Sequence, residues 1–178
     1  AAENIPDSKI LEQIKILNED YRKKNTGINT INSFHIGLAT DAQIEFVLAT
    51  KDPNCVTMPV AGIERKKINK SYVDHQINEA KFASLGGLDA WPSNQYLNVW
   101  VVPRIDLGTN TNTGIAGVGQ FPGGDPKTDG VIITYVNVGY GSVPNYNLGR
   151  TATHEVGHWL GLRHLWGMNV DGCNANDD

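Results

Sequence analysis

The sequence predicts an α+β fold, in which helices pack behind a β-sheet and the last helix carries a cluster of histidines. Three observations predict it: an amphipathic helical pattern near the N-terminus, several strand-like runs in the middle, and a helical, histidine-rich segment near residue 155. The chain has 178 residues, of which 40% are hydrophobic, enough for one domain with a sizeable core. Because neither an internal repeat nor a linker interrupts the chain, we interpret residues 1–178 as a single domain.

The first expected element is a helix over about residues 8–24. Its apolar residues recur at spacings of four, three and four and so form one stripe: Ile10, Ile14, Leu17 and Tyr21. Asp7 or Ser8 is placed to cap its start, and Gly27 lies just past its end. This pattern predicts a helix that backs a sheet with one face.

The middle of the chain contains runs of apolar and β-branched residues that favour strands. The expected strands cover residues 34–39, 43–49, 62–68, 96–102, 115–121 and 131–138. The run at 96–102 is apolar at nearly every position, which predicts a central strand buried on both faces. The strand at 115–121 lies in a stretch rich in glycine and proline, which we interpret as a long surface connection. Structural roles are expected for His35 and His75.

A histidine-rich segment near the C-terminus carries the chemistry. If residues 150–160 are helical, His154 and His158 lie four apart and project from one face. Two imidazole nitrogens on one face can share a Zn²⁺ at about 2.0–2.1 Å each. Gly161 allows the left-handed turn that ends a helix, and that turn can bring His164 back to the metal. We therefore predict one zinc ion bound by His154, His158 and His164.

Three protein ligands leave the fourth position of a zinc ion open for water, which is typical of catalytic sites. Glu155 stands beside the metal, where it can take a proton from that water. Two alternatives stay open. Cys173 could complete a structural zinc site with four protein ligands, or the chain could be a zinc-binding fragment with little or no turnover of its own.

The charge, the N-terminal segment and the cysteines limit which partners and which location are expected. The net charge of −4 argues against nucleic acid or an anionic membrane as the main partner. The N-terminus lacks the basic and apolar regions of a signal peptide, and no apolar run reaches the length of a transmembrane helix. Cys55 and Cys173 are compatible with one disulfide, with pairing elsewhere or with free thiols.

The segment from His154 to His164 matches the pattern H-E-x-x-H-x-x-G-x-x-H, the metzincin zinc signature. Further stretches resemble one branch, the pappalysin-type (cytophagalysin) metalloproteases: residues 96–101, 116–124, 129–131, 148–153, and 159–167 with 171–173. The resemblance extends from about Ile10 to the last residue and is strongest from Tyr96 onward.

The resemblance implies a twisted, mostly parallel sheet with one antiparallel edge strand, a backing helix and an active-site helix. It also implies a secreted endopeptidase, made as a zymogen, that acts on proteins or peptides. In that family the substrate pairs with the edge strand, which corresponds here to Ala116, Gly117, Val118 and Gly119. Such pairing uses the unsatisfied N–H and C=O groups of an exposed edge.

The resemblance also implies calcium in loops after the zinc site, as a structural ion. Candidate oxygen ligands lie in the C-terminal tail: Asp171, Asn174, Asp177 and Asp178. The family has a C-terminal subdomain with a methionine turn beneath the zinc, whereas only fourteen residues follow His164 here. We therefore expect that this subdomain is missing from the chain, and that a companion C-terminal fragment is one possible partner.

Overall fold

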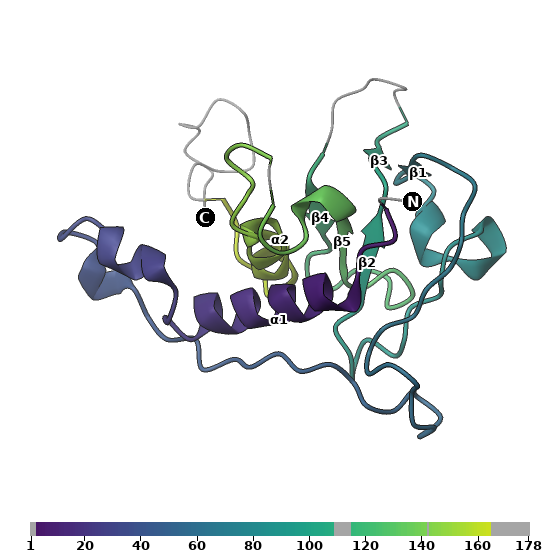
Figure 1. The fold of residues 1–178 in the computed structure, drawn as a ribbon, viewed down its shortest axis with the longest axis horizontal. Coiled ribbons are helices and arrows are strands. Elements are labelled where there is room, and N and C mark those ends of the chain that lie inside the picture. Colours follow the sequence, from purple (N-terminus) through teal and green to yellow (C-terminus); the bar gives the residue numbers. More distant parts are fainter. Residues whose placement is uncertain (1–2, 109–114, 142, 165–178) are drawn as a thin grey trace.

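A computed structural model describes residues 3–108, 115–141 and 143–164 of the chain. Its centre is a three-stranded sheet with two helices packed on one face (Figure 1). The helices are α1 (Asp7–Tyr21) and α2 (Arg150–Trp159). The strands of this sheet are β2 (Val99–Val102), β4 (Gly117–Gly119) and β5 (Val131–Thr134). The expected α+β class is confirmed.

The strand order is β2-β5-β4, so β4 forms an edge of the sheet. β2 runs parallel to β5, with Val99 opposite Val131, and β4 runs antiparallel to β5, with Val118 opposite Ile132. A second, two-stranded sheet pairs β1 (Val73–Asp74) with β3 (Ile105–Asp106) in parallel. The mostly parallel sheet with one antiparallel edge strand is therefore confirmed.

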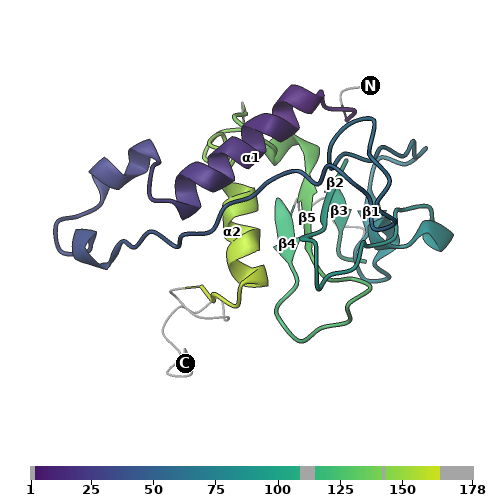
Figure 2. The same cartoon turned by 90° about the horizontal axis from the view of Figure 1, so that it is seen from below.

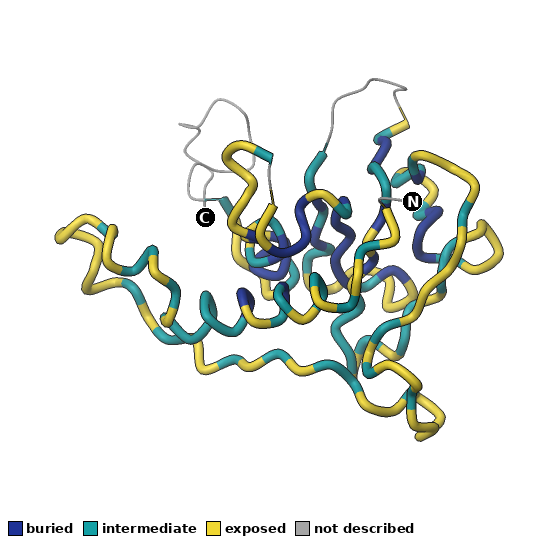
Figure 3. Tube along the Cα trace, viewed as in Figure 1, coloured by how far each residue is buried: buried dark blue, intermediate teal, exposed yellow. Residues whose placement is uncertain are grey.

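Strand β5 lies at the centre of the core, because every one of its residues is buried (Figure 3). Val131 and Ile133 face the helices and form one apolar cluster with Leu17, Val138, Ala152 and Val156. Ile132 faces the opposite side and forms a second cluster with Val73, Ala80, Trp100, Val102 and Ile105. Since successive side chains of a strand point to opposite faces, β5 joins the two clusters.

Helix α1 holds α2 in place through polar contacts as well as through the apolar stripe. The buried Gln13 side chain donates to the Gly149 carbonyl oxygen at 2.9 Å and accepts from the Gly139 N–H at 2.8 Å. Near the other end of α1, the Tyr21 hydroxyl donates to the Thr153 carbonyl oxygen at 3.1 Å. Buried partners of this kind fix the start of α2, the helix that carries the predicted metal ligands.

The N-terminal helix is shorter than expected, and its start lacks the predicted cap. It spans Asp7–Tyr21 rather than residues 8–24, and Pro6 occupies the N-cap position, with no side-chain hydrogen bond there. Proline is favourable at a helix start because its fixed φ suits the first turn and it has no N–H to satisfy.

Three expected strands are absent. Residues 34–39 contain the 3₁₀ turn η2 (Ile36–Leu38), and Phe34 is 82% exposed. Residues 43–49 and 62–68 form no strand, although the Phe46 backbone bonds to the Asn18 side chain at 2.7 and 2.9 Å. Figure 2 shows the stretch around residues 43–49 passing along α1. Alternation of apolar residues predicts a strand only where a partner strand lies alongside, and here a helix side chain takes that place.

Two other expectations need correction. Strand β2 is not buried on both faces: Val99 is 45% exposed and Val101 is 37% exposed, although both share the helix-facing side with Val131. The helices cover β5 but do not cover these two valines, which therefore stay partly exposed to solvent. The expected strand at 131–138 ends at Thr134, where the 3₁₀ turn η5 (Tyr135–Asn137) begins.

The described chain also contains three further short 3₁₀ turns: η1 (Thr26–Thr30), η3 (Glu79–Lys81) and η4 (Ala83–Leu85). None of the helices in the described ranges has the length and apolar character needed to cross a bilayer.

Candidate metal centre

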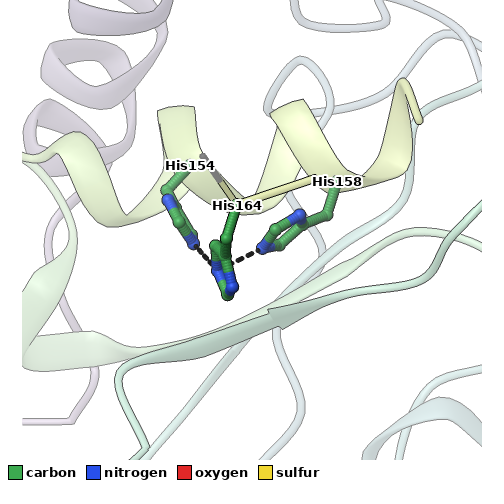
Figure 4. Close-up of side chains that lie close together, drawn as sticks. All are labelled: His154, His158 and His164. Carbon is green, nitrogen blue, oxygen red and sulfur yellow. Dashed lines mark hydrogen bonds between the residues drawn. The ribbon is translucent and has the colours of Figure 1, made fainter. Parts of the chain in front are cut away.

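Helix α2 presents His154 and His158 on the same side, one helical turn apart (Figure 4). Their rings lie edge to face with centroids 4.5 Å apart. His154 is exposed, whereas His158 is only 9% exposed. The expected helix over 150–160 is therefore confirmed, and it places two imidazoles side by side.

The helix ends in a Schellman turn at Gly161, which has a φ of 92°. The Leu162 N–H donates to the Gly157 carbonyl oxygen at 2.9 Å, and the Gly161 N–H donates to the His158 carbonyl oxygen at 2.8 Å. A positive φ is favourable only for glycine, so Gly161 is the residue that permits this reversal. The predicted left-handed turn is confirmed.

The turn brings His164 back beneath the helix. Its Nε2 lies 3.0 Å from the Nε2 of His154 and 3.1 Å from the Nε2 of His158. These three ligand atoms all lie within 4.8 Å of one another. Among the described residues no other group of three His, Cys, Asp or Glu side chains could hold a metal ion. His35 and His75, for which structural roles were expected, are not part of this cluster.

The three nitrogens fit a tetrahedral zinc ion. Zinc–nitrogen bonds of about 2.0–2.1 Å place two ligand nitrogens about 3.4 Å apart, a few tenths of an ångström more than the observed separations. The His158 Nδ1 lies 2.8 Å from the Leu162 carbonyl oxygen. A proton on Nδ1 satisfies that carbonyl and leaves the Nε2 lone pair for the metal.

The charge state also suits a metal. Burial lowers the pKa of His154, and the neighbouring His158 and His164 lower it further. A histidine must be neutral to bind a metal, so the surroundings favour the binding form. Cys173, the fourth ligand of the structural alternative, lies outside the described residues, as do the candidate calcium ligands.

Glu155 lies between the metal ligands and the edge strand β4. It is 7% exposed, and the Gly119 N–H is close enough to its carboxylate to favour the charged form. Burial raises the pKa of Glu155, whereas His158 and the Gly119 N–H oppose that shift. A carboxylate with a raised pKa is suited to accepting a proton and then releasing it near neutral pH.

The glycines of β4 allow the strand to lie directly against α2. A Cβ at Gly117 would lie 2.8 Å from the Glu155 Cγ, and a Cβ at Gly119 would lie 2.1 Å from the Glu155 carbonyl oxygen. The resemblance implied that a substrate peptide pairs with this strand. In the structure, helix α2 fills the space where their side chains would stand.

The outer edge of β4 is formed by backbone groups of its two glycines. Ala116 pairs with Thr134 through a 3.0 Å bond, and Val118 lies opposite Ile132. Because hydrogen-bonded and non-hydrogen-bonded pairs alternate in an antiparallel ladder, the N–H and C=O groups of Gly117 and Gly119 point away from β5. The Gly119 N–H of this edge lies near the Glu155 carboxylate.

Sequence reasoning missed several residues that surround the centre. The Phe121 ring lies against His158, with centroids 5.1 Å apart. The Trp159 indole Nε1 lies 3.2 Å from each carboxylate oxygen of Asp129. Lys81 is buried behind Asp129. Phe121, Asp129 and Trp159 lie in or next to a predicted strand or ligand, whereas nothing in the sequence pointed to Lys81. The contacts themselves depend on the tertiary fold.

Comparison with known proteins identifies the class. The family model of the M43 peptidases, described as pregnancy-associated plasma protein-A, matches residues 86–178, just over half of the chain. The chain therefore belongs to this peptidase family. Together with the three converging histidines, membership supports a metallopeptidase related to the pappalysins, as the resemblance implied.

Individual relatives agree. An extracellular metalloprotease of Arthroderma benhamiae is 28% identical over 178 residues, which cover 97% of this chain and 51% of the relative. An extracellular metalloprotease of Neurospora crassa is 50% identical over 50 residues, which cover 28% of this chain and 16% of the relative. The chain thus spans about half the length of the curated relatives that it matches along nearly its full length.

Solved structures show the same fold. Mature mirolysin of Tannerella forsythia, in complex with a cleaved peptide, superposes with a TM-score of 0.88 at 41% identity. The match covers 100% of this chain and 64% of that chain. Promirolysin from the same organism gives a TM-score of 0.84 at 42% identity, over 94% of this chain and 53% of that chain.

Proposed function

We propose that this chain carries the zinc-binding part of a secreted endopeptidase, in which Glu155 is the general base. One observation carries the proposal: the Nε2 atoms of His154 and His158, on α2, meet that of His164, beyond the Gly161 turn, at 3.0–3.1 Å. The names of the relatives, extracellular metalloproteases, support both the activity and the location. Because the chain spans about half the length of those relatives, the activity is proposed for the whole protein.

A zinc ion, when bound, supplies a Lewis acid that polarises the scissile carbonyl and makes a water ligand acidic. His154, His158 and His164 would hold the ion through their Nε2 atoms. Glu155 takes the proton of the attacking water and gives it to the leaving amine nitrogen. The Gly119 N–H favours the charged form of this carboxylate, and Gly117 and Gly119 let β4 lie directly against Glu155. Positioned acid–base groups of this kind accelerate proton transfers by about 10²–10⁴-fold.

The peptide substrate is proposed to pair with β4 as an added strand. The outward backbone groups of Gly117 and Gly119 lie on the same edge that contacts Glu155, so an extended peptide paired there runs past the general base. The outward N–H and C=O groups of these two glycines are the proposed pairing groups. The complex of mirolysin with a cleaved peptide is compatible with a peptide substrate here.

The experiment measures zinc content and peptide cleavage in the whole protein, with a quenched-fluorescent peptide library as substrate. We expect about one zinc per chain, loss of cleavage on zinc removal and recovery on zinc addition. The variant Glu155→Gln should keep its zinc and lose about 10²–10⁴-fold in kcat/KM. The matched control, Glu64→Gln, changes an exposed glutamate and should leave both quantities unchanged. An active Glu155→Gln protein would exclude the proposed base.

The alternative, a zinc-binding fragment without turnover, makes a different prediction. Residues 1–178 alone would bind zinc with full stoichiometry and cleave no peptide, and a companion fragment would not restore cleavage. The endopeptidase proposal predicts that the longer protein, or this chain with the remainder added, cleaves the library.

A further inference from the structure

An indole side chain connects the end of helix α2 to the start of strand β5. Trp159 is the last residue of α2 and directly follows the ligand His158. Its ring packs against the apolar cluster beneath the helices. Its one polar atom, Nε1, is 3.2 Å from both oxygens of Asp129. A bond to an ionised acceptor is about twice as strong as a neutral one, so this contact holds the indole firmly.

Asp129 is itself fixed from two sides. Its carbonyl oxygen accepts from the Asn98 side chain at 3.4 Å. The next residue, Gly130, has a φ of 139°, and a Cβ there would lie 2.2 Å from the Asn98 carbonyl oxygen. Asp129 therefore sits where the chain enters β5, in a backbone conformation that only glycine allows at the following position.

A buried cation stands behind this carboxylate. Lys81 in η3 is 3% exposed, and its Nζ donates to the Thr128 carbonyl oxygen at 2.6 Å and lies 5.1 Å from the centre of the Trp100 ring. Burial lowers the pKa of Lys81 to about 8, and the Asp129 carboxylate opposes that shift. A buried ammonium is costly without a counter-charge, and Asp129 supplies it.

Trp159 is also the first residue of the segment that returns the chain to the metal. The Schellman bonds at Gly161 and the contact from His158 Nδ1 to the Leu162 carbonyl make residues 157–162 one compact unit. A shift of Trp159 would therefore move His158 directly, and would move His164 through the turn.

We propose that Asp129 is a positioning residue for the metal centre: with Lys81 behind it, Asp129 fixes Trp159, and through Trp159 it fixes the backbone that joins His158 to His164. The inference rests on the proposed zinc site. Its expected size follows from the general behaviour of partners outside the ligand sphere, whose loss typically weakens metal binding 10–100-fold.

The test compares two ends of the same helix. Asp129→Asn removes the charge, and Trp159→Phe removes the N–H while keeping an aromatic ring. The matched control is Gln13→Met, which removes the buried bonds to Gly149 and Gly139 at the start of α2 and so lowers stability without touching the helix end. All proteins are prepared as the full 178-residue chain, and zinc dissociation constants are measured by competition with a fluorescent chelator.

We expect zinc binding to weaken 10–100-fold in Asp129→Asn and in Trp159→Phe, and to stay within about twofold of wild type in Gln13→Met although its melting temperature falls. Cobalt-substituted protein gives a second readout, because its visible absorption bands depend on ligand geometry. The bands should shift in the two variants and match wild type in Gln13→Met.

Lys81→Met should also weaken zinc binding. If Lys81 acts through Asp129, the fold-loss of zinc affinity in Lys81→Met/Asp129→Asn should be smaller than the product of the fold-losses in the two single variants.

Unchanged zinc affinity and unchanged cobalt spectra in both Asp129→Asn and Trp159→Phe would overturn the inference while leaving the zinc site intact. Equal losses in Gln13→Met would also overturn it, because general destabilisation would then explain the effect. If the wild-type chain binds no zinc at all, the proposed function fails first, and this inference fails with it.

Discussion

Gly119 of β4 lies directly against Glu155 of α2. A Cβ at Gly119 would lie 2.1 Å from the Glu155 carbonyl oxygen, and the Gly119 N–H favours the charged form of the Glu155 carboxylate. One residue of the edge strand thus sets how closely the strand approaches the helix that carries the proposed general base. The pair joins the two parts of the proposed active site, the peptide-binding edge and the metal-bearing helix.

This packing predicts that Gly119→Ala destabilises the fold. The added methyl group must push β4 and α2 apart, and overpacking of this kind typically costs about 1–3 kcal/mol. Urea unfolding of the metal-free chain measures the difference. The matched control is Gly37→Ala, where a Cβ would meet nothing within 4 Å, and its stability should stay within about 0.5 kcal/mol of wild type. Equal stability of the two variants would show that there is room for a methyl group between β4 and α2.

Strand addition at β4 predicts an alternating response to N-methylation of the substrate. Only every second residue of a paired strand directs its backbone groups to the partner. N-methylation of the substrate amides that face β4 should therefore lower kcat/KM at least tenfold. N-methylation of the amides that face away from β4 should leave kcat/KM nearly unchanged. The enzyme itself stays unchanged, which avoids the steric damage that a proline at Gly117 or Gly119 would cause. A methylated series cleaved as fast as the parent peptide at every position would remove β4 as the docking strand.

The buried Lys81 predicts a stability that depends on alkaline pH. Its pKa is about 8 in the folded chain against 10.5 as the ordinary value, so the unfolded state binds more protons between these pH values. Stability therefore rises as pH increases from about 8 to about 10.5, by at most roughly 3 kcal/mol. The metal-free variant Lys81→Met should lack this rise, whereas the exposed control Lys127→Met should retain it. Parallel stability curves for wild type and Lys81→Met, recorded by urea unfolding from pH 7 to 10.5, would contradict the burial of a charged Lys81.

The metal-binding helix could be predicted closely because its signals are local. His158 lies four positions after His154, and Gly161 ends the helix just beyond, so spacing and turn chemistry alone placed His164 near the other ligands. The apolar stripe of α1 was visible for the same reason. Both predictions depend on contacts between residues close in the sequence.

The rest depends on contacts between distant parts of the chain. Residues 43–49 alternate like a strand, yet Phe46 bonds to the side chain of Asn18 rather than to a strand. The glycines of β4 were visible in the sequence as small residues. Only the fold shows that α2 fills the space that larger side chains would need at these positions. Likewise, thirty residues separate Asp129 from Trp159. No local pattern reports such a contact.

Calcium binding remains a prediction for the C-terminal tail. If Asp171, Asp177 and neighbouring oxygens bind the ion, titration of Ca²⁺ into zinc-loaded, calcium-free protein should raise the melting temperature. At 100 times the dissociation constant the gain is about 2.7 kcal/mol. Mg²⁺ serves as the control, because it demands a smaller and more regular site and should have a weaker effect. An unchanged melting temperature at millimolar Ca²⁺ would remove calcium from the account.

The central claim is that His154, His158 and His164 hold one zinc ion, and metal analysis of His158→Ala tests it most directly. Wild-type chain and His35→Ala, which alters an exposed histidine outside the cluster, should each contain about one zinc by mass spectrometry after dialysis against metal-free buffer. His158→Ala should contain almost none, because two nitrogens rarely retain zinc against dialysis. A full equivalent of zinc in His158→Ala would contradict the assignment of the site.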